Sequence, residues 1–358
     1  MKLDFVKCRT ALCLWFAVFS TVTVAQDLSN STAVATGATQ PISLGNRWGA
    51  ISTVLDFGAK DANFAQNFDS TAAFASALAS GKDYIFVPKG KYLISSSLTI
   101  PSGVVIQFSN QARLVANANN LTFFKVASSA YGSQVRDATL DGTGKTNVTG
   151  FDLSSFRSRA RIDNVRMENM DYGIVLRSLC WDIVIDNPNS QGVKYPIWIM
   201  SGSNVVDIRH PALDTYIWGV NIEGGTYPTV GVTITGGFIQ NGQIGIVDKA
   251  TATRIHNTYF EGNSASDIAL MAAINPEVSG TLHYANVGQS AIRAVQTKGA
   301  VIKNPLMTSG SRSIGLFDVD ATNVKAFAWV SPVDGVVNKP LGISAGLGWF
   351  VTTPTSIP

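Results

Sequence analysis

From residue 150 onward the sequence reads Gly150-Phe-Asp-Leu, Gly173-Ile-Val-Leu, Pro196-Ile-Trp-Ile, Gly219-Val-Asn-Ile, Gly245-Ile-Val-Asp, Asp267-Ile-Ala-Leu, Ala291-Ile-Arg-Ala and Gly315-Leu-Phe-Asp at the start of successive units. These starts are separated by 23, 23, 23, 26, 22, 24 and 24 residues. A repeat of this length indicates units that cannot bury an apolar face alone and must stack on their neighbours. Long repeat folds behave as one unit, so the length of 358 residues does not by itself call for two domains.

The repeat units are typical of β-strands. They are rich in Val, Ile, Thr, Asn and Gly, and they alternate like strands without a helical stripe. About 23 residues suits three short strands and three turns, and is too short for a strand plus a full helix. Upstream, residues 84–94 and 98–108 each indicate two strands around a turn with Pro and Gly. We predict an all-β fold, a single-stranded right-handed parallel β-helix whose N-terminal end is capped by a short helix.

The capping helix is predicted over residues 69–81. Asp69 or Ser70 can accept hydrogen bonds from the free N–H groups of its first turn. Phe74 and Leu78 lie four residues apart on one face, and Gly81 ends the helix. Such a helix would cover the strand edges and apolar interior at an open end of the solenoid.

The first coils resemble a known family. The residues that carry the resemblance are Leu55-Asp-Phe-Gly-Ala-Lys60, Asp69-Ser-Thr-Ala-Ala-Phe74, Phe86-Val-Pro-Lys-Gly-Lys-Tyr92 and Ile100-Pro-Ser-Gly-Val104. They resemble the opening coils of the pectate-lyase-like superfamily, in its rhamnogalacturonase/epimerase-like branch. Upstream, Ala35-Thr-Gly37 and Ser43-Leu-Gly-Asn-Arg-Trp48 look like the segment that precedes the β-helix in many bacteriophage tailspike proteins. The resemblance implies a parallel β-helix that acts on polysaccharides.

The family's functional motifs are not matched. The usual Gly-Asp-Gly after Ala-Lys is Asp61-Ala-Asn63 here, and the paired Asp before Thr is reduced to Phe68-Asp-Ser70. The polygalacturonase motifs Asn-Thr-Asp, Asp-Asp, Gly-His-Gly and Arg-Ile-Lys are absent. Arg209-His-Pro-Ala-Leu-Asp214 approaches the Arg-x-Pro-x-x-Arg motif of calcium-dependent pectate lyases but ends in Asp. The resemblance therefore implies a fold and leaves the activity to be argued from the site.

The N-terminus predicts secretion. Three basic residues precede a mainly apolar run from Ala11 and a small-residue stretch that ends at Ala25, which is typical of a signal peptide. The alternative is an uncleaved anchor, although the run is short for a membrane span, and we predict no span in the mature chain. The predicted divisions are a signal peptide (1–25), a flexible leader (26–50), the β-helix domain (51–340) and a C-terminal tail (341–358).

Charge and cysteine content exclude several classes of function. The chain has 27 Lys and Arg against 24 Asp and Glu, and loss of residues 1–25 removes three basic and one acidic side chain, leaving 24 against 23. A nearly neutral protein lacks the basic surface that nucleic-acid binding requires. Cys8 and Cys13 would leave with the signal peptide, so Cys180 alone remains and can form neither an intrachain disulfide nor a cysteine-rich metal site.

The repeat register predicts columns of side chains, because equivalent positions of adjacent coils lie about 4.8 Å apart. The first and third residues after each pattern start are nearly all apolar and should face the interior, so the second and fourth should face solvent. A Trp among charged side chains on that outward ribbon can cover a sugar face while the charges bind hydroxyls or carboxylates. The alternative is a solvated face with one stray Trp. The predicted substrate-binding residues of this ribbon are Arg177, Trp198, Asn221, Glu223 and Lys249.

A second column is aromatic. Tyr172, Tyr195 and Trp218 each precede a pattern start. Their parity along the strand matches that of the interior positions. We therefore predict that these three side chains belong to the core.

Four residues are predicted to be catalytic. Glu168 and Asp214 lie two coils apart, or roughly 9–10 Å by the strand spacing, near the upper end of the roughly 6.5–9.5 Å that inverting hydrolysis uses. Asp171 falls beside Lys194 of the next coil. An acid beside a cation suits elimination, which needs a base for the proton next to a uronate carboxylate and a positive charge for that carboxylate.

Another set of columns contains Asp163, Asp186 and Arg209, with Asn164, Asn187 and His210 alongside. Asn and Asp in such columns form side-chain ladders that stabilise turns. Because acids surround them, Arg209 and His210 are also predicted to bind substrate. No metal-ligand spacing is present and no cofactor is predicted; Ca²⁺ held by Asp163 and Asp186 is an alternative that no spacing supports.

These observations favour a secreted enzyme that cleaves an extracellular, acidic polysaccharide by elimination or hydrolysis, as a monomer or homotrimer. Its groove would cross the coils near residues 160–225, where acids, basic residues and Trp198 concentrate. The alternative from another class is a non-catalytic carbohydrate-binding or structural β-helix, such as a surface adhesin or a tailspike-like module. A polysaccharide epimerase is a third reading. The missing catalytic motifs count for the non-catalytic alternative.

Overall fold

The computed structural model describes residues 32–33, 42–43, 51–284, 290–303, 305–307, 316–317 and 325–327. The predicted signal peptide, the C-terminal tail and most of the predicted leader lie outside these residues. Contacts divide the chain into residues 1–50 and residues 51–358. In the first unit, β1 (Thr32–Ala33) pairs antiparallel with β2 (Ile42–Ser43). The second unit contains the solenoid.

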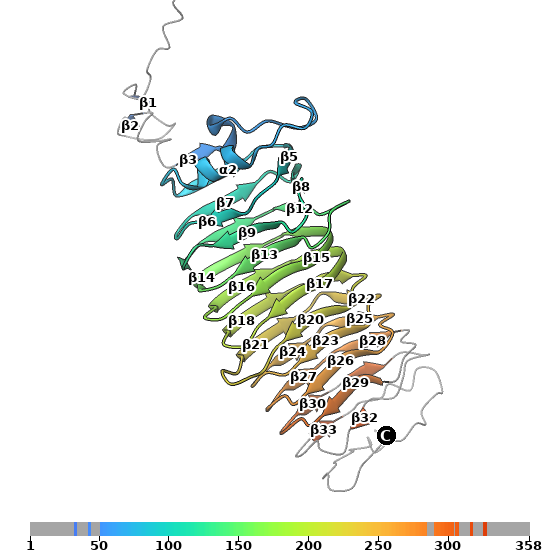
Figure 1. Ribbon diagram of the computed structural model, residues 1–358. Coiled ribbons are helices and arrows are strands. Elements are labelled where there is room, and N and C mark those ends of the chain that lie inside the picture. The colour runs from blue at the N-terminus through green and yellow to red at the C-terminus, as the bar shows by residue number, and fades with distance from the viewer. Residues whose placement is uncertain are drawn as a thin grey trace, which may run out of the picture. The chain divides into compact units, whose positions relative to one another are not determined.

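The described residues from Ile51 to Phe327 form a parallel β-helix, as predicted (Figure 1). Successive strands of each coil join three ladders, and all the pairings within the ladders are parallel. The first ladder contains β3 (Ile51–Thr53), β4 (Tyr84–Val87), β7 (Val105–Phe108), β10 (Ala130–Tyr131), β11 (Gln134–Arg136), β14 (Phe156–Asp163), β16 (Trp181–Asp186), β18 (Asn204–Arg209), β21 (Val230–Thr235), β24 (Arg254–His256), β27 (Glu277–Ser279), β30 (Val301–Lys303) and β33 (Lys325–Phe327).

The other two ladders meet within β15 (Arg166–Leu176) and β17 (Asn189–Ile199), so they form one 18-stranded sheet. The second ladder contains β5 (Gly90–Ile94), β8 (Ala112–Ala116), β12 (Thr139–Asp141), the first halves of β15 and β17, β19 (Ala212–Asp214), β22 (Phe238–Gln240), β25 (Tyr259–Glu261), β28 (Leu282–Tyr284) and β31 (Leu306–Met307). The third ladder contains β6 (Leu98–Ile100), β9 (Thr122–Val126), β13 (Thr149–Leu153), the second halves of β15 and β17, β20 (Trp218–Ile222), β23 (Ile244–Asp248), β26 (Ser266–Met271), β29 (Ser290–Val295) and β32 (Leu316–Phe317).

The core lies inside the coils and follows the predicted alternation. The inward positions of the third ladder have no exposed surface at Ile174, Leu176, Ile197, Ile199, Val220, Ile222, Ile268 and Leu270. Full burial of one such side chain contributes about 1.5–3 kcal/mol. Each coil therefore gains most of its stability from the stack on either side of it.

Glycine opens the repeat pattern because neighbouring coils approach closely where the second ladder bends into the third. A Cβ on Gly173 would lie 2.3 Å from the carbonyl oxygen of Pro196, and one on Gly219 would lie 2.6 Å from that of Gly245. A side chain at either position would force the backbones of adjacent coils apart. The glycine thus fixes the bend that shapes the outer face.

The turn between the first and second ladders uses residues with left-handed backbone angles. Asp137, Asn164, Asn187 and His210 have φ values of 58°, 50°, 48° and 48°, a region that Asn and Asp adopt more readily than most residues. The Asn187 amide donates to Asn164 Oδ1 at 2.8 Å, and the Asn164 amide donates to Asp137 Oδ1 at 2.6 Å. The predicted side-chain ladder is therefore confirmed here.

A short helix covers the first coil, as predicted. It is α2 (Thr71–Leu78), preceded by the 3₁₀ turn η1 (Val54–Phe57). Asp69 Oδ1 accepts a hydrogen bond from the Thr71 amide at 2.9 Å, while Phe74 and Leu78 are buried. Within the described residues, no helix has the length and apolar character needed to cross a membrane.

Candidate functional site

A groove of about 350 Å³ lies on the outer face of the third ladder. Its walls come from the coils of β9, β13, β15 and β17, so it runs across the strands rather than along one of them. The lining residues are Asn120, Thr122, Asn147, Thr149, Asp152, Tyr172, Val175, Arg177, Trp198 and Met200. Two of them, Arg177 and Trp198, are predicted substrate-binding residues.

Four aromatic rings gather at one end of this groove. Tyr172 stacks on Tyr195 with ring centroids 5.2 Å apart and an interplanar angle of 23°. The indole of Trp198 lies 5.7 Å from Tyr172, 5.2 Å from Tyr195 and 6.1 Å from Trp218. The rings belong to three adjacent coils, and all four are partly exposed. We call this set the aromatic cluster.

The prediction that Tyr172, Tyr195 and Trp218 belong to the core is wrong. Met170 and Ile174 both point inward, and Gly173 is buried at the bend between them. The alternation breaks at this bend, where Gly173 and Ile174 are buried in succession, so Tyr172 is left facing outward. Tyr195 pairs with Tyr172 in the ladder and follows it.

The Trp198 indole is held across the next coil, where its Nε1 donates to Glu223 Oε1 at 2.6 Å. Trp198 pairs in the ladder with Asn221, two residues before Glu223. Asn221, predicted to face solvent, is only 1% exposed, and neither atom of its amide has a hydrogen-bond partner. Asn221 is buried, and not exposed as predicted, because the Trp198 indole lies across the coil that contains it. Lys249 is half-buried and follows Asp248, which pairs with Ile222.

Two cations beside the groove are each paired with a carboxylate. Arg177 Nη2 donates to Asp152 Oδ2 at 2.8 Å, and this hydrogen bond raises the pKa of Arg177. Lys194 Nζ lies 2.5 Å from Asp171 Oδ1. Burial alone would raise the pKa of Asp171, but the hydrogen bonds from Lys194 and the Val148 amide hold it below its usual value. The hydrogen bond to Asp171 raises the pKa of Lys194.

Glu168 and Asp214 lie two ladder steps apart, as their spacing predicts, because both align with Gln191. They belong to the second ladder, whereas the groove lies on the third. Arg113 and Arg166 already contact the Glu168 carboxylate at 2.7 and 2.5 Å. A substrate would have to displace both guanidinium groups to reach it.

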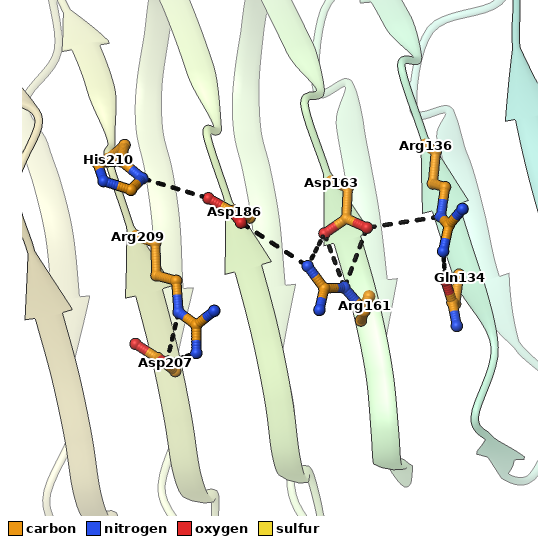
Figure 2. Close-up of polar contacts among 8 residues, drawn as sticks. All are labelled: Gln134, Arg136, Arg161, Asp163, Asp186, Asp207, Arg209 and His210. Carbon is orange, nitrogen blue, oxygen red and sulfur yellow. Dashed lines mark hydrogen bonds and ion pairs between the residues drawn. The ribbon is translucent and has the colours of Figure 1, made fainter.

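Arg209 ends β18 of the first ladder and His210 lies in the turn that follows, among the charged residues of Figure 2; neither is brought together with Trp198. Arg161 contacts Asp163 at 3.0 Å and Asp186 at 3.7 Å, and His210 Nδ1 lies 3.4 Å from Asp186 Oδ1. Because the Arg161 guanidinium already lies beside both carboxylates, its positive charge disfavours a Ca²⁺ ion bound between them. Across the described residues, no group of three His, Cys, Asp or Glu side chains is placed to hold a metal ion.

The sequence analysis missed a polar network inside the coils. His283 Nδ1 lies 2.7 Å from Asp267 Oδ2, and Thr281 Oγ1 lies 2.9 Å from His283 Nε2. None of the three residues has exposed surface, so a substrate cannot reach this Thr-His-Asp arrangement and its role is structural. One signal was available: Asp267 takes the place of the usual glycine in the repeat pattern.

Comparisons with known proteins agree with the fold. The structure resembles the ORF18 protein of Geobacillus virus E2 (TM-score 0.62, 15% identity), covering 80% of this chain and 62% of that one. It also resembles the A-module of a mannuronan C-5 epimerase from Azotobacter vinelandii (TM-score 0.60, 15% identity, 85% and 100% covered). A third similar structure is the surface adhesin PfbA of Streptococcus pneumoniae (TM-score 0.58, 13% identity, 78% and 86% covered).

No protein-family model and no curated protein matches the sequence. The chain spans 62% of the length of the viral protein. At 13–15% identity, these likenesses concern the arrangement of the backbone and not the residues of a site. What this chain shares with the three proteins is the parallel β-helix fold.

Proposed function

We propose that the protein binds a carbohydrate chain along the groove of the third ladder. The observation that carries this proposal is the aromatic cluster, in which Tyr172, Tyr195, Trp198 and Trp218 lie beside a groove that crosses successive coils. Aromatic rings pack against the apolar faces of sugars, while polar groups around them bind hydroxyls. Asn120, Thr122 and Asn147 supply such groups in the same groove.

The paired charges favour neutral sugars in this groove. Arg177 is engaged by Asp152, and Lys194 is engaged by Asp171. An acidic sugar would have to break one of these pairs before it gained its own. Hydroxyl groups can instead bind the outer atoms of each pair without separating the charges.

The resemblances and the N-terminus support the setting of this function. The mannuronan epimerase is named for a polysaccharide, and the adhesin is named as a surface protein. The N-terminal sequence has the features of a signal peptide. We therefore place the protein outside the cell, where it would meet an extracellular polysaccharide.

A panel of neutral and acidic polysaccharides tests the proposal by affinity electrophoresis. Trp198→Ala should weaken binding of the preferred glycan about fivefold or more, since a central aromatic contact of this kind commonly contributes more than about 1 kcal/mol. Phe64→Ala is the matched control, because Phe64 is an aromatic residue 90% exposed near the capping helix. Binding by Trp198→Ala equal to that of the wild type would place the site elsewhere.

Cleavage of an acidic glycan is a second candidate function, an alternative to the binding of a neutral glycan in the same groove. It is favoured by Asp171 and Lys194, which directly precede Tyr172 and Tyr195 of the aromatic cluster and form an acid–cation pair. With the pKa of Asp171 lowered and that of Lys194 raised, both are charged at neutral pH. Such a pair offers a weak base and a cation for a substrate carboxylate.

Elimination and hydrolysis have different products. Ultraviolet absorbance of unsaturated uronates would establish elimination, and Asp171→Asn and Lys194→Ala should then abolish it. New reducing ends without absorbance would establish hydrolysis and direct attention to Glu168→Gln and Asp214→Asn. The screen is run with and without Ca²⁺. Absence of both products, with binding retained, leaves binding as the function.

A further inference from the structure

A second aromatic feature lies on the first ladder, at β10 and at the beginnings of β14 and β16. Tyr131, Arg157 and Trp181 pair directly in the ladder. The Arg157 guanidinium lies 4.8 Å from the Tyr131 ring centroid and 5.9 Å from a ring of Trp181. Its Nη2 donates to the Tyr131 hydroxyl at 2.6 Å. A cation is thus held between two aromatic side chains of adjacent coils.

This cation has no ion-pair partner among the described residues. The Nε of Arg157 is buried without a hydrogen-bond partner. The groove differs, because there Arg177 and Lys194 are each paired with a carboxylate. A guanidinium that two rings hold in place and that lacks a carboxylate is prepared to bind an anion.

Exposed apolar side chains lie on this and the following coils. Tyr131 and Trp181 are 44% and 42% exposed, and Leu179 and Val205 are 57% and 61% exposed. Leu179 lies two residues before Trp181, and Val205 follows the residue that pairs with Trp181. We call Tyr131, Arg157, Leu179, Trp181 and Val205 the Arg157 patch.

Backbone strain marks the same place. Leu179 and Val205 have φ values of 60° and 52°, in the left-handed region that bulky and β-branched residues avoid. The ladder aligns Val205 with Asp182 and Gly231, whose residue types adopt this conformation more easily. Two strained apolar side chains that project into solvent do not stabilise the fold. Such strain is typical of binding surfaces.

We propose that the Arg157 patch binds an acidic sugar, with the sugar carboxylate on Arg157 and the sugar ring against Tyr131 or Trp181. The partner class follows from charge and size. The three adjacent coils of Tyr131, Arg157 and Trp181 span roughly 10 Å by the strand spacing, which is about one or two sugar rings. A protein partner would need about 800 Å² on this side. The carbohydrate class rests on the proposed function, but the patch and the groove lie on different ladders and bind different sugars.

Calorimetry with two probes, an oligogalacturonate and a neutral cello-oligosaccharide, tests the patch. Arg157→Gln should weaken oligogalacturonate binding about tenfold to a hundredfold, the effect of losing a charge-assisted hydrogen bond. Arg157→Lys should recover only part of that loss, because it keeps the charge without the planar fork. Arg159→Gln removes a nearby exposed arginine and should bind like the wild type. Thermal melts confirm that each variant is folded.

The outcomes separate this proposal from the previous one. Trp198→Ala should leave oligogalacturonate binding intact and affect only a neutral glycan. If Trp198→Ala changes no binding while Arg157→Gln does, the groove fails and the patch stands. The patch is overturned if the wild type binds no oligogalacturonate, or if Arg157→Gln binds it as well as the wild type does. Binding of poly-glutamate alone, dependent on Arg157, would indicate an acidic protein partner and also overturn it.

Discussion

Asp248 shows what a single residue can do to an otherwise aliphatic interior. It occupies an inward position of the repeat and has no exposed surface. Its Oδ1 accepts hydrogen bonds from the Ala250 amide at 2.9 Å and from Thr253 Oγ1 at 3.0 Å, whereas its Oδ2 has no partner. Burial therefore outweighs these hydrogen bonds and raises the pKa of Asp248 to about 6.

The raised pKa makes stability depend on pH. Because the folded protein holds this proton more tightly than the unfolded chain does, stability from this group is greatest below pH 4 and falls as the pH rises to about 6. A shift of about two units corresponds to roughly 3 kcal/mol. Asp248→Asn cannot ionise and should gain stability relative to the wild type between pH 4 and pH 7. Thermal melts of both proteins at several pH values measure this, and a difference in Tm that stays constant with pH would contradict it.

The turns between the first and second ladders keep the coils in register. Asn187 has a φ of 48° and donates its side-chain amide to Asn164 of the preceding coil. The residue thus accommodates a left-handed turn and also links two coils. The Asn-rich composition predicts this ladder, because Asn is the common non-glycine residue with both properties.

Two substitutions separate the roles of Asn187. Asn187→Ala loses the hydrogen bond and puts alanine, which adopts the left-handed region less readily than asparagine, into this turn. It should therefore lower the free energy of unfolding by about 1–3 kcal/mol. Asn187→Gly loses the same hydrogen bond but adopts the turn freely, so it should cost less. Denaturant unfolding of the two variants side by side measures the difference. A glycine variant less stable than the alanine variant would show that the backbone angle is unimportant.

The shape of the strands also explains which parts of the site could be predicted from the sequence. The position of Trp198 on the outer face follows from alternation along a straight strand, and the structure confirms it. Tyr172 was misplaced because alternation fails at the bend beside Gly173, which a count of residues does not reveal. The burial of Asn221 depends on an indole from the preceding coil, and the pairing of His283 with Asp267 joins two coils. Contacts between coils need the register and the side-chain directions together.

The 23-residue period together with the strand-like alternation was enough to predict a parallel β-helix for the molecule, since few folds stack all-strand units of that length. The period does not reveal where the surface is hollowed or which charges pair. The full chain has a formal net charge of only +3, yet its charged side chains differ in whether they form ion pairs. Arg177 and Lys194 beside the groove are each paired with a carboxylate, whereas Arg157 has no ion pair among the described residues.

This contrast predicts two responses to salt. Binding of a neutral glycan in the groove should change less than about twofold between about 0.05 M and 0.5 M NaCl, because no net charge is neutralised. Binding of oligogalacturonate should weaken several-fold over the same range, because it depends on Arg157. Calorimetric titrations at the two ionic strengths measure both. Equal salt dependence of the two ligands would contradict the assignment of separate surfaces.

The direction of the ladders has a mechanical consequence. Hydrogen bonds between coils run from each strand to its parallel neighbours in the stack, so they point along the axis of the solenoid. A force that pulls the ends of the described β-helix apart acts along these bonds and passes through every interface between coils in turn. The weakest interface therefore opens first. A force applied across the axis would load many strands together. The solenoid should therefore yield coil by coil when stretched lengthwise and resist a sideways load far better.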